Sequence, residues 1–104
     1  MSGTTLSSAG LDARRRRAHY RAWHRGTREM DLLMGRFCDA RLPTLPDDEL
    51  AELETLIDAD DQALFSWIAG GETPPAEHDT KLFRHLRQFH LSGQGLPGVG
   101  SAEP

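Results

Sequence analysis

The chain has 104 residues, of which 38% are apolar and 27% charged, and its formal net charge is −4. This length allows one domain with a thin core and leaves little room for an enclosed substrate pocket. No apolar run approaches the roughly 20 residues that a membrane-spanning helix needs. The single cysteine, Cys38, cannot form an internal disulfide, and no secretory pattern precedes it, so we expect a cytoplasmic protein. A mitochondrial presequence is the weaker interpretation, because the early arginines merge into the first expected helix.

Charge is distributed unevenly along the chain. Residues 1–41 carry nine arginines and four acidic residues, a net charge of +5. Residues 42–104 carry three basic and twelve acidic residues, a net charge of −9. We therefore expect a basic end and an acidic end, which can steer association with a partner of complementary charge.

Five helices and no strand are predicted, between polar tails at residues 1–10 and 93–104 that we expect to be disordered. The first helix spans residues 11–24, is rich in arginine, and ends or bends at Gly26 because glycine leaves helical geometry easily. The second spans residues 27–40 and has the clearest amphipathic pattern. Its apolar face repeats every three or four residues and consists of Met30, Leu33, Met34, Phe37 and Cys38.

The remaining three helices follow proline or glycine breaks. The third has Pro46 in its first turn, followed by three acidic residues at the positive end of the helix dipole. The fourth, at residues 62–69, is capped by Asp60 or Asp61 and ends at Gly70. The fifth begins after Pro75 and runs to about residue 91. Their apolar residues are Leu50, Leu53, Leu56 and Ile57; Leu64, Phe65, Trp67 and Ile68; and Leu82, Phe83, Leu86 and Phe89. Short helices of this kind bury their apolar faces only against one another, so we predict a compact all-α bundle over residues 11–92.

The segment Arg25-Gly26-Thr27-Arg28-Glu29 combines a glycine, two guanidinium groups and a carboxylate. The spacing allows ion pairs between Arg25 and Glu29 and between Arg28 and Asp31 if the backbone is helical, and Glu29 could form half of a capping box with Gly26. On spacing alone, the plainer interpretation is a glycine turn with surface ion pairs worth a few tenths of a kcal/mol each. The alternative is a surface that docks on another protein.

A wider resemblance favours docking. Residues 20–37, with their Arg-Gly-x-x-Glu motif at Arg25, Gly26 and Glu29, resemble the assembly factors that promote covalent attachment of FAD to succinate dehydrogenase. Residues 60–68, an acidic pair followed by Leu-Phe-x-Trp-Ile, are similar to a second segment of that family. The resemblance covers about residues 14–90, with His24 where the family often has arginine and Ile68 where it has leucine.

This resemblance implies a five-helix protein without a catalytic residue of its own. Its implied partner is the flavoprotein subunit of succinate dehydrogenase, with fumarate reductase as a second candidate. It implies that no cofactor is bound stably by this chain, which acts on the FAD of its partner. Carried over residue by residue, the partner-binding surface comprises Arg21, Arg25, Gly26, Thr27, Arg28, Glu29 and Asp31.

The sequence gives less support to nucleic-acid binding, to catalysis and to metal binding. The arginines of the first helix could bind nucleic acid, although the chain is acidic overall and only Tyr20 and Trp23 accompany them. A small enzyme acting on flavin would need a phosphate-binding loop, and none is found. The five histidines lack metal-ligand spacing, so we expect no metal site. Phe65 and Trp67 are predicted to pack in the core, and Cys38 to behave as a small hydrophobic residue.

Overall fold

The computed structural model of the chain describes residues 10–93, which form an all-α bundle of five helices without a strand in that range. The helices are α1 (Ala13–Trp23), α2 (Arg28–Arg41), α3 (Asp47–Ile57), α4 (Asp61–Ile68) and α5 (Lys81–Leu91), with short 3-10 segments η2 (Leu42–Thr44) and η3 (Ala76–His78). The predicted fold class is confirmed. Of the two tails predicted to be disordered, all but Gly10 and Gly93 lie outside the described residues.

Helix starts follow the local capping chemistry. The side chains of Asp12, Thr27, Asp60 and Thr80 each accept a backbone N–H at the start of a helix, which satisfies donors that have no partner within the helix. Two starts differ from prediction. Pro46 precedes α3 as its N-cap instead of lying in the first turn. The fifth helix begins only at residue 81, because η3 and the Thr80 cap come between it and Pro75.

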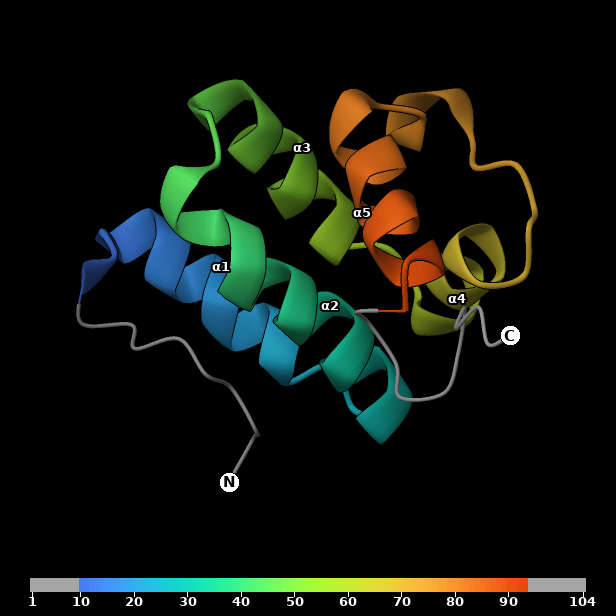
Figure 1. Cartoon of the computed structure of the whole chain (residues 1–104), viewed down its shortest axis with the longest axis horizontal. Helices are drawn as coiled ribbons and strands as arrows, with labels where there is room; N and C mark the ends of the chain where they lie inside the picture. The colour runs from blue at the N-terminus through green and yellow to red at the C-terminus, as the bar shows by residue number, and fades with distance from the viewer. Residues whose placement is uncertain (1–9, 94–104) are drawn as a thin grey trace.

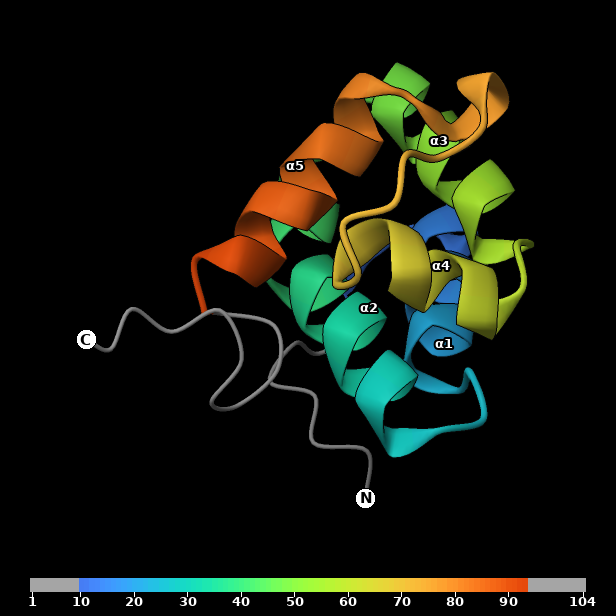
Figure 2. The same ribbon diagram turned by 90° about the vertical axis from the view of Figure 1, so that its right-hand side faces the viewer.

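The helices pack around α1 and α2, which run antiparallel and side by side (Figure 1). Gly35 permits this close approach, because a Cβ placed there would lie 2.3 Å from the indole ring of Trp23. α3 lies against α1 on one side and against α5 on the other. α4 lies beside α2 when the molecule is turned (Figure 2) and also contacts α5.

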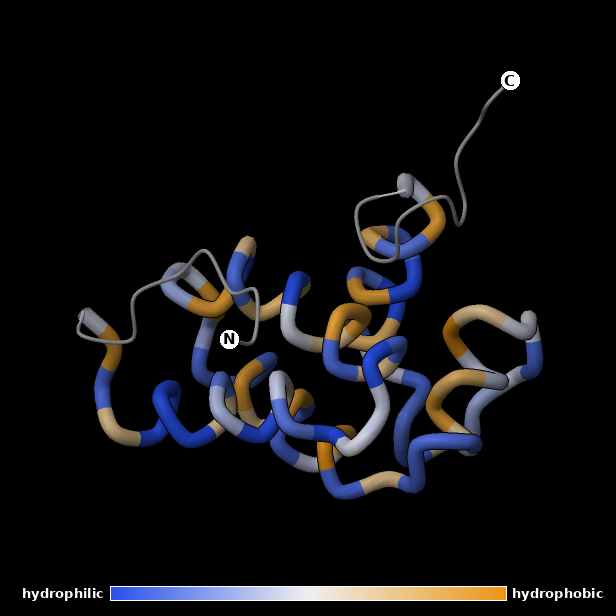
Figure 3. Tube along the Cα trace, turned by 90° about the horizontal axis from the view of Figure 1, so that it is seen from below, coloured by the Kyte–Doolittle hydropathy of each residue, from blue (hydrophilic) through white to orange (hydrophobic). Residues whose placement is uncertain are grey.

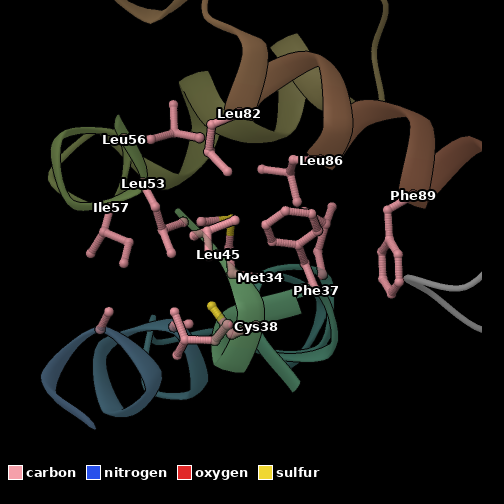
Figure 4. Packing of buried hydrophobic residues seen from close by; sticks show 14 of the residues in the cluster. Met34, Phe37, Cys38, Leu45, Leu53, Leu56, Ile57, Leu82, Leu86 and Phe89 are labelled. Carbon is pink, nitrogen blue, oxygen red and sulfur yellow. The ribbon is translucent and has the colours of Figure 1, made fainter. Parts of the chain in front are cut away.

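The apolar faces of all five helices meet in one core. Hydrophobic and hydrophilic residues are interspersed along the chain trace (Figure 3), and the hydrophobic residues that repeat along each helix are mostly the buried ones. α2 contributes Phe37, whose ring meets that of Phe89 edge-on at 5.6 Å between centroids (Figure 4). Cys38 is completely buried in this core, and burial raises the pKa of its thiol to about 12. The thiol is therefore neutral at physiological pH, as expected for a packing residue.

Folding brings the basic and acidic parts of the chain together. Arg14 of α1 makes two hydrogen bonds of 2.8 Å to Glu54 of α3, and these bonds lower the pKa of the Glu54 carboxyl. Arg21 pairs with Asp58 just beyond the same helix. The expectation of separate basic and acidic ends is therefore wrong for this part of the molecule. The two helices lie side by side, and their charges partly neutralise each other.

His90 gives a pH-dependent test of the packing of α5. Its imidazole is buried, and its Nδ1 atom has no hydrogen-bond partner among residues 10–93. Burial lowers the pKa of His90 from its ordinary value of 6.5. The unfolded chain therefore takes up a proton near pH 6.5, whereas folded His90 takes one up only at lower pH, so this residue makes the free energy of unfolding fall as pH decreases through that interval. We expect His90→Leu to weaken that pH dependence in urea titrations between about pH 5 and pH 8.

The control for this prediction is Leu91→Ala, which shortens a half-exposed apolar side chain next to His90 in α5 and removes no titratable group. It should leave the pH dependence close to that of the unmodified chain. If His90→Leu also leaves it unchanged, the neutral buried state of His90 is contradicted.

Candidate functional site

Residues 24–27 connect α1 to α2 and carry the start of the Arg-Gly-x-x-Glu motif. Gly26 has a backbone φ of +118°, a conformation that side chains on an L-residue disfavour. A Cβ placed on Gly26 would meet no atom within 4 Å. The glycine is therefore required by the backbone conformation of the turn, and the space in front of it is open.

Asp31 and Thr27 hold this turn through the backbone. The Oδ1 atom of Asp31 accepts N–H bonds from Arg25 at 2.5 Å and from Gly26 at 3.3 Å. Thr27 Oγ1 accepts the N–H of Met30 at 3.2 Å, which makes Thr27 the N-cap of α2. The predicted capping role of Glu29 is therefore wrong. Arg25 also precedes the helix, so the ion pair with Glu29 that a helical backbone would allow does not form.

The guanidinium group of Arg25 lies inside the molecule, where its side chain is only 8% exposed. Its Nε atom donates to Asp61 Oδ1 at 2.8 Å, and its Nη2 atom donates to the carbonyl of Ala59 at 2.7 Å. A further bond runs from Nη1 to the carbonyl of Ile57 at the end of α3. The expectation that this planar group is free to bind a partner does not hold. Arg25 instead fastens the connection between α1 and α2 to the junction between α3 and α4.

The structure thus divides the predicted site residues into a surface group and a supporting group. Gly26, Thr27, Arg28 and Glu29 are exposed and adjacent. Asp31 is half-buried beneath the turn, and Arg25 is covered. Arg21 is half-exposed one turn before Arg25, where it pairs with Asp58. The exposed group contains no nucleophile paired with a base, and no cluster among residues 10–93 is arranged to hold a metal ion.

A groove of about 510 Å³ lies between the start of α2 and α4. We call it the α2–α4 groove; its lining residues are Thr27, Glu29, Met30, Asp61, Gln62, Phe65 and Ser66. Phe65 is 40% exposed there, so its predicted place in the core is wrong. Leu64 and Ile68 are the buried residues of α4, while Trp67 packs against the core as expected.

The groove and the pairing of Asp61 with Arg25 were not predicted from the sequence. The feature that could have indicated them is the second segment that resembles the family, residues 60–68, because it contains both Asp61 and Phe65. A second hollow of about 430 Å³ lies on the turn itself and is lined by residues that include Gly26, Thr27 and Arg28. The exposed part of the motif therefore borders two concave surfaces.

Within residues 10–93, no helix has both the length and the apolar character that a membrane span requires.

Comparisons with known proteins identify the family. The family model described as flavinator of succinate dehydrogenase matches residues 16–90. The FAD assembly factor SdhE of Acetobacter pasteurianus is 36% identical over 85 residues, covering 82% of this chain and 78% of that protein. The protein of the same description from Coxiella burnetii is 31% identical over 65 residues, 62% of this chain and 79% of that protein.

A more distant relative is the mitochondrial succinate dehydrogenase assembly factor 2 of Komagataella phaffii, which is 31% identical over 88 residues. These cover 81% of this chain but 46% of that protein, so the chain spans about half the length of this relative. No solved structure matches the chain. The family match and the bacterial relatives agree, and the chain belongs to the flavinator family of succinate dehydrogenase, whose members are assembly factors and not enzymes.

Proposed function

We propose that this chain binds the flavoprotein subunit of succinate dehydrogenase and promotes the covalent attachment of FAD to it. The flavoprotein of fumarate reductase is a second candidate partner. The observation that carries the proposal is the exposed segment Gly26–Glu29, which stands on the surface while Asp31 and Arg25 fix its backbone from beneath. A surface held in this way loses little conformational entropy on binding, which favours a defined complex.

The chain would act by positioning. FAD would become attached to a histidine that belongs to the flavoprotein itself, and the exposed segment of this chain would supply no reacting group. Holding two reacting groups in a productive geometry can accelerate a reaction by several orders of magnitude. By docking on the flavoprotein, this chain would favour the conformation in which its histidine and flavin meet. FAD stays with the partner throughout.

Three of the five arginines in α1 are engaged within the protein, which favours protein docking over nucleic-acid binding. Arg14 and Arg21 pair with acidic residues of the α3 region, and Arg15 binds Asp12 together with the carbonyls of Leu42 and Leu45. Phosphate contacts need free cationic groups, and of the five arginines only Arg16 and Arg17 remain exposed without an ion pair among residues 10–93.

The experiment that tests the proposal compares covalent flavin on the flavoprotein, as fluorescence after denaturing electrophoresis, in cells with and without this chain. Loss of the signal without the chain is expected, and an unchanged signal contradicts the proposal.

Glu29→Ala should separate docking from folding. Glu29 is exposed and Thr27, not Glu29, caps α2 among residues 10–93, so removal of the Glu29 side chain should cost only a few tenths of a kcal/mol through the helix dipole. We expect covalent flavinylation at limiting concentrations of this chain to fall about tenfold, as for loss of a charged contact at an interface. The far-UV circular dichroism should be unchanged.

The matched control is Asp48→Ala, which removes an exposed acidic residue from the same position of α3. It should leave flavinylation intact. Equal loss in both variants would point to overall charge, and unfolding of Glu29→Ala would show that the motif is structural.

A further inference from the structure

The α2–α4 groove is lined by two acidic residues with an exposed aromatic ring between them. Glu29 is exposed at one side, and no hydrogen bond or ion pair engages its carboxylate among residues 10–93. Asp61 lines the other side, 28% exposed, and uses its Oδ1 atom to hold Arg25. Phe65, 40% exposed, provides the apolar surface between them, and the nearly buried Met30 lies at the floor of the groove. No basic side chain lines the groove.

The charges and shape of the groove indicate the chemistry of its occupant. Arg25 pairs with Asp61 from the buried side, whereas no ion pair engages Glu29 within the described part of the chain. A long cationic side chain fits this arrangement, because its aliphatic stem can cover the exposed ring of Phe65 while its charged end meets Glu29. A guanidinium or ammonium group over the ring of Phe65 would also gain a cation–π interaction. An acidic segment would be repelled by the Glu29 carboxylate. A purely apolar segment would remove water from that carboxylate without giving it a partner.

We propose that the α2–α4 groove binds one arginine or lysine side chain of the flavoprotein, held between Glu29 and the exposed ring of Phe65. This inference rests on the proposed function, because it names the kind of contact that the partner makes at the same site. It also gives Phe65 a role in binding. Arg25 supports the groove, since it fixes both the turn before Glu29 and the start of α4 that carries Phe65.

The first test measures the dissociation constant of the purified flavoprotein subunit by calorimetry or surface binding. Glu29→Gln removes the charge and keeps the shape, and Phe65→Ala removes the ring. Each should weaken binding about tenfold, the effect of removing one charged or aromatic contact from an interface. Phe65→Tyr keeps an aromatic face and should bind within about twofold of the unmodified chain. The controls are Asp48→Asn and Leu91→Ala, an exposed acid and a 51% exposed apolar residue that both lie outside the groove.

The second test asks whether Glu29 and Phe65 contact the same side chain of the flavoprotein. If they do, the double variant should bind about tenfold to thirtyfold more weakly than the unmodified chain, well short of the hundredfold loss expected for independent contacts. A photo-crosslinking residue at position 65 should link to a flavoprotein peptide that contains arginine or lysine. Reversing that residue to glutamate should abolish binding, and Glu29→Arg in this chain should restore part of it.

The outcomes separate the groove from the proposed function. If the flavoprotein does not bind the unmodified chain, the proposed function itself fails. If it binds, and Gly26→Arg prevents this while Glu29→Gln and Phe65→Ala do not, the function stands and the groove inference is overturned. Independent, fully additive losses or a crosslink to a peptide without a basic residue also overturn it.

Discussion

Gly26→Arg is expected to abolish binding to the flavoprotein and its covalent flavinylation, while the chain stays folded. The φ of +118° makes any side chain at this position unfavourable, at a cost of about 1–3 kcal/mol of stability. A Cβ at Gly26 would meet no atom of the described residues within 4 Å, so the start of the added side chain has open space in front of it. It would therefore project outward from the turn, into the space that the partner is proposed to occupy. Binding is measured with the purified flavoprotein, and flavinylation by fluorescence of the denatured subunit.

Gly71 offers a matched control for this experiment. It also has a positive φ, of +79°, and also has open space around a Cβ, but it lies beyond the end of α4 and lines neither hollow beside the motif. Gly71→Arg should lose a similar amount of stability and keep flavinylation. If both variants lose flavinylation equally, the effect comes from strain in the fold, and the interface assignment of Gly26 is contradicted.

Arg25→Met should give the largest loss of stability among the variants considered. It removes a nearly buried guanidinium and leaves the carbonyls of Ile57 and Ala59 without their donor and Asp61 without its cation. Loss of such a network costs about 3 kcal/mol, which for a domain of this size lowers the melting temperature by roughly 10–20 °C. Urea and thermal unfolding followed by circular dichroism measure both quantities.

Arg14→Met is the comparison that isolates burial. It breaks a bidentate pair with Glu54, but the side chains there are 40% and 35% exposed, so the expected loss is below about 1 kcal/mol. Similar losses for the two variants would mean that the Arg25 network contributes no more than a surface ion pair. Because Arg25 is covered, we further expect Arg25→Met to reduce flavinylation only to the extent that the variant is unfolded. Glu29→Ala should instead reduce flavinylation while the chain stays folded.

Local sequence was sufficient to predict the helices. The three- and four-residue apolar spacing of α2 identifies its buried face from Met30 to Cys38, and all of that face is buried. The glycine turn and the acidic cap of α4 were also predicted, since both depend on neighbouring residues alone. Helix starts at Pro46 and Pro75 were less exact, because a proline can precede a helix or lie in its first turn with similar ease.

The division of the motif into exposed and supporting residues depends on the tertiary structure. Arg25 and Glu29 are four residues apart, yet one is buried and the other is on the surface. The reason is a contact between Arg25 and Asp61, 36 residues away in the sequence, which no local periodicity predicts. Phe65 shows the same limit, since apolar character alone does not say which of two adjacent faces of α4 the bundle covers.

Sequence alone therefore determined that the chain forms five amphipathic helices, with a glycine-containing turn between the first two. Only the packing of α3 and α4 against that turn decided which groups face solvent. The physical reason is that helix formation and capping are settled within one or two turns of chain, whereas the exposure of a charge depends on distant groups that come together when the bundle closes.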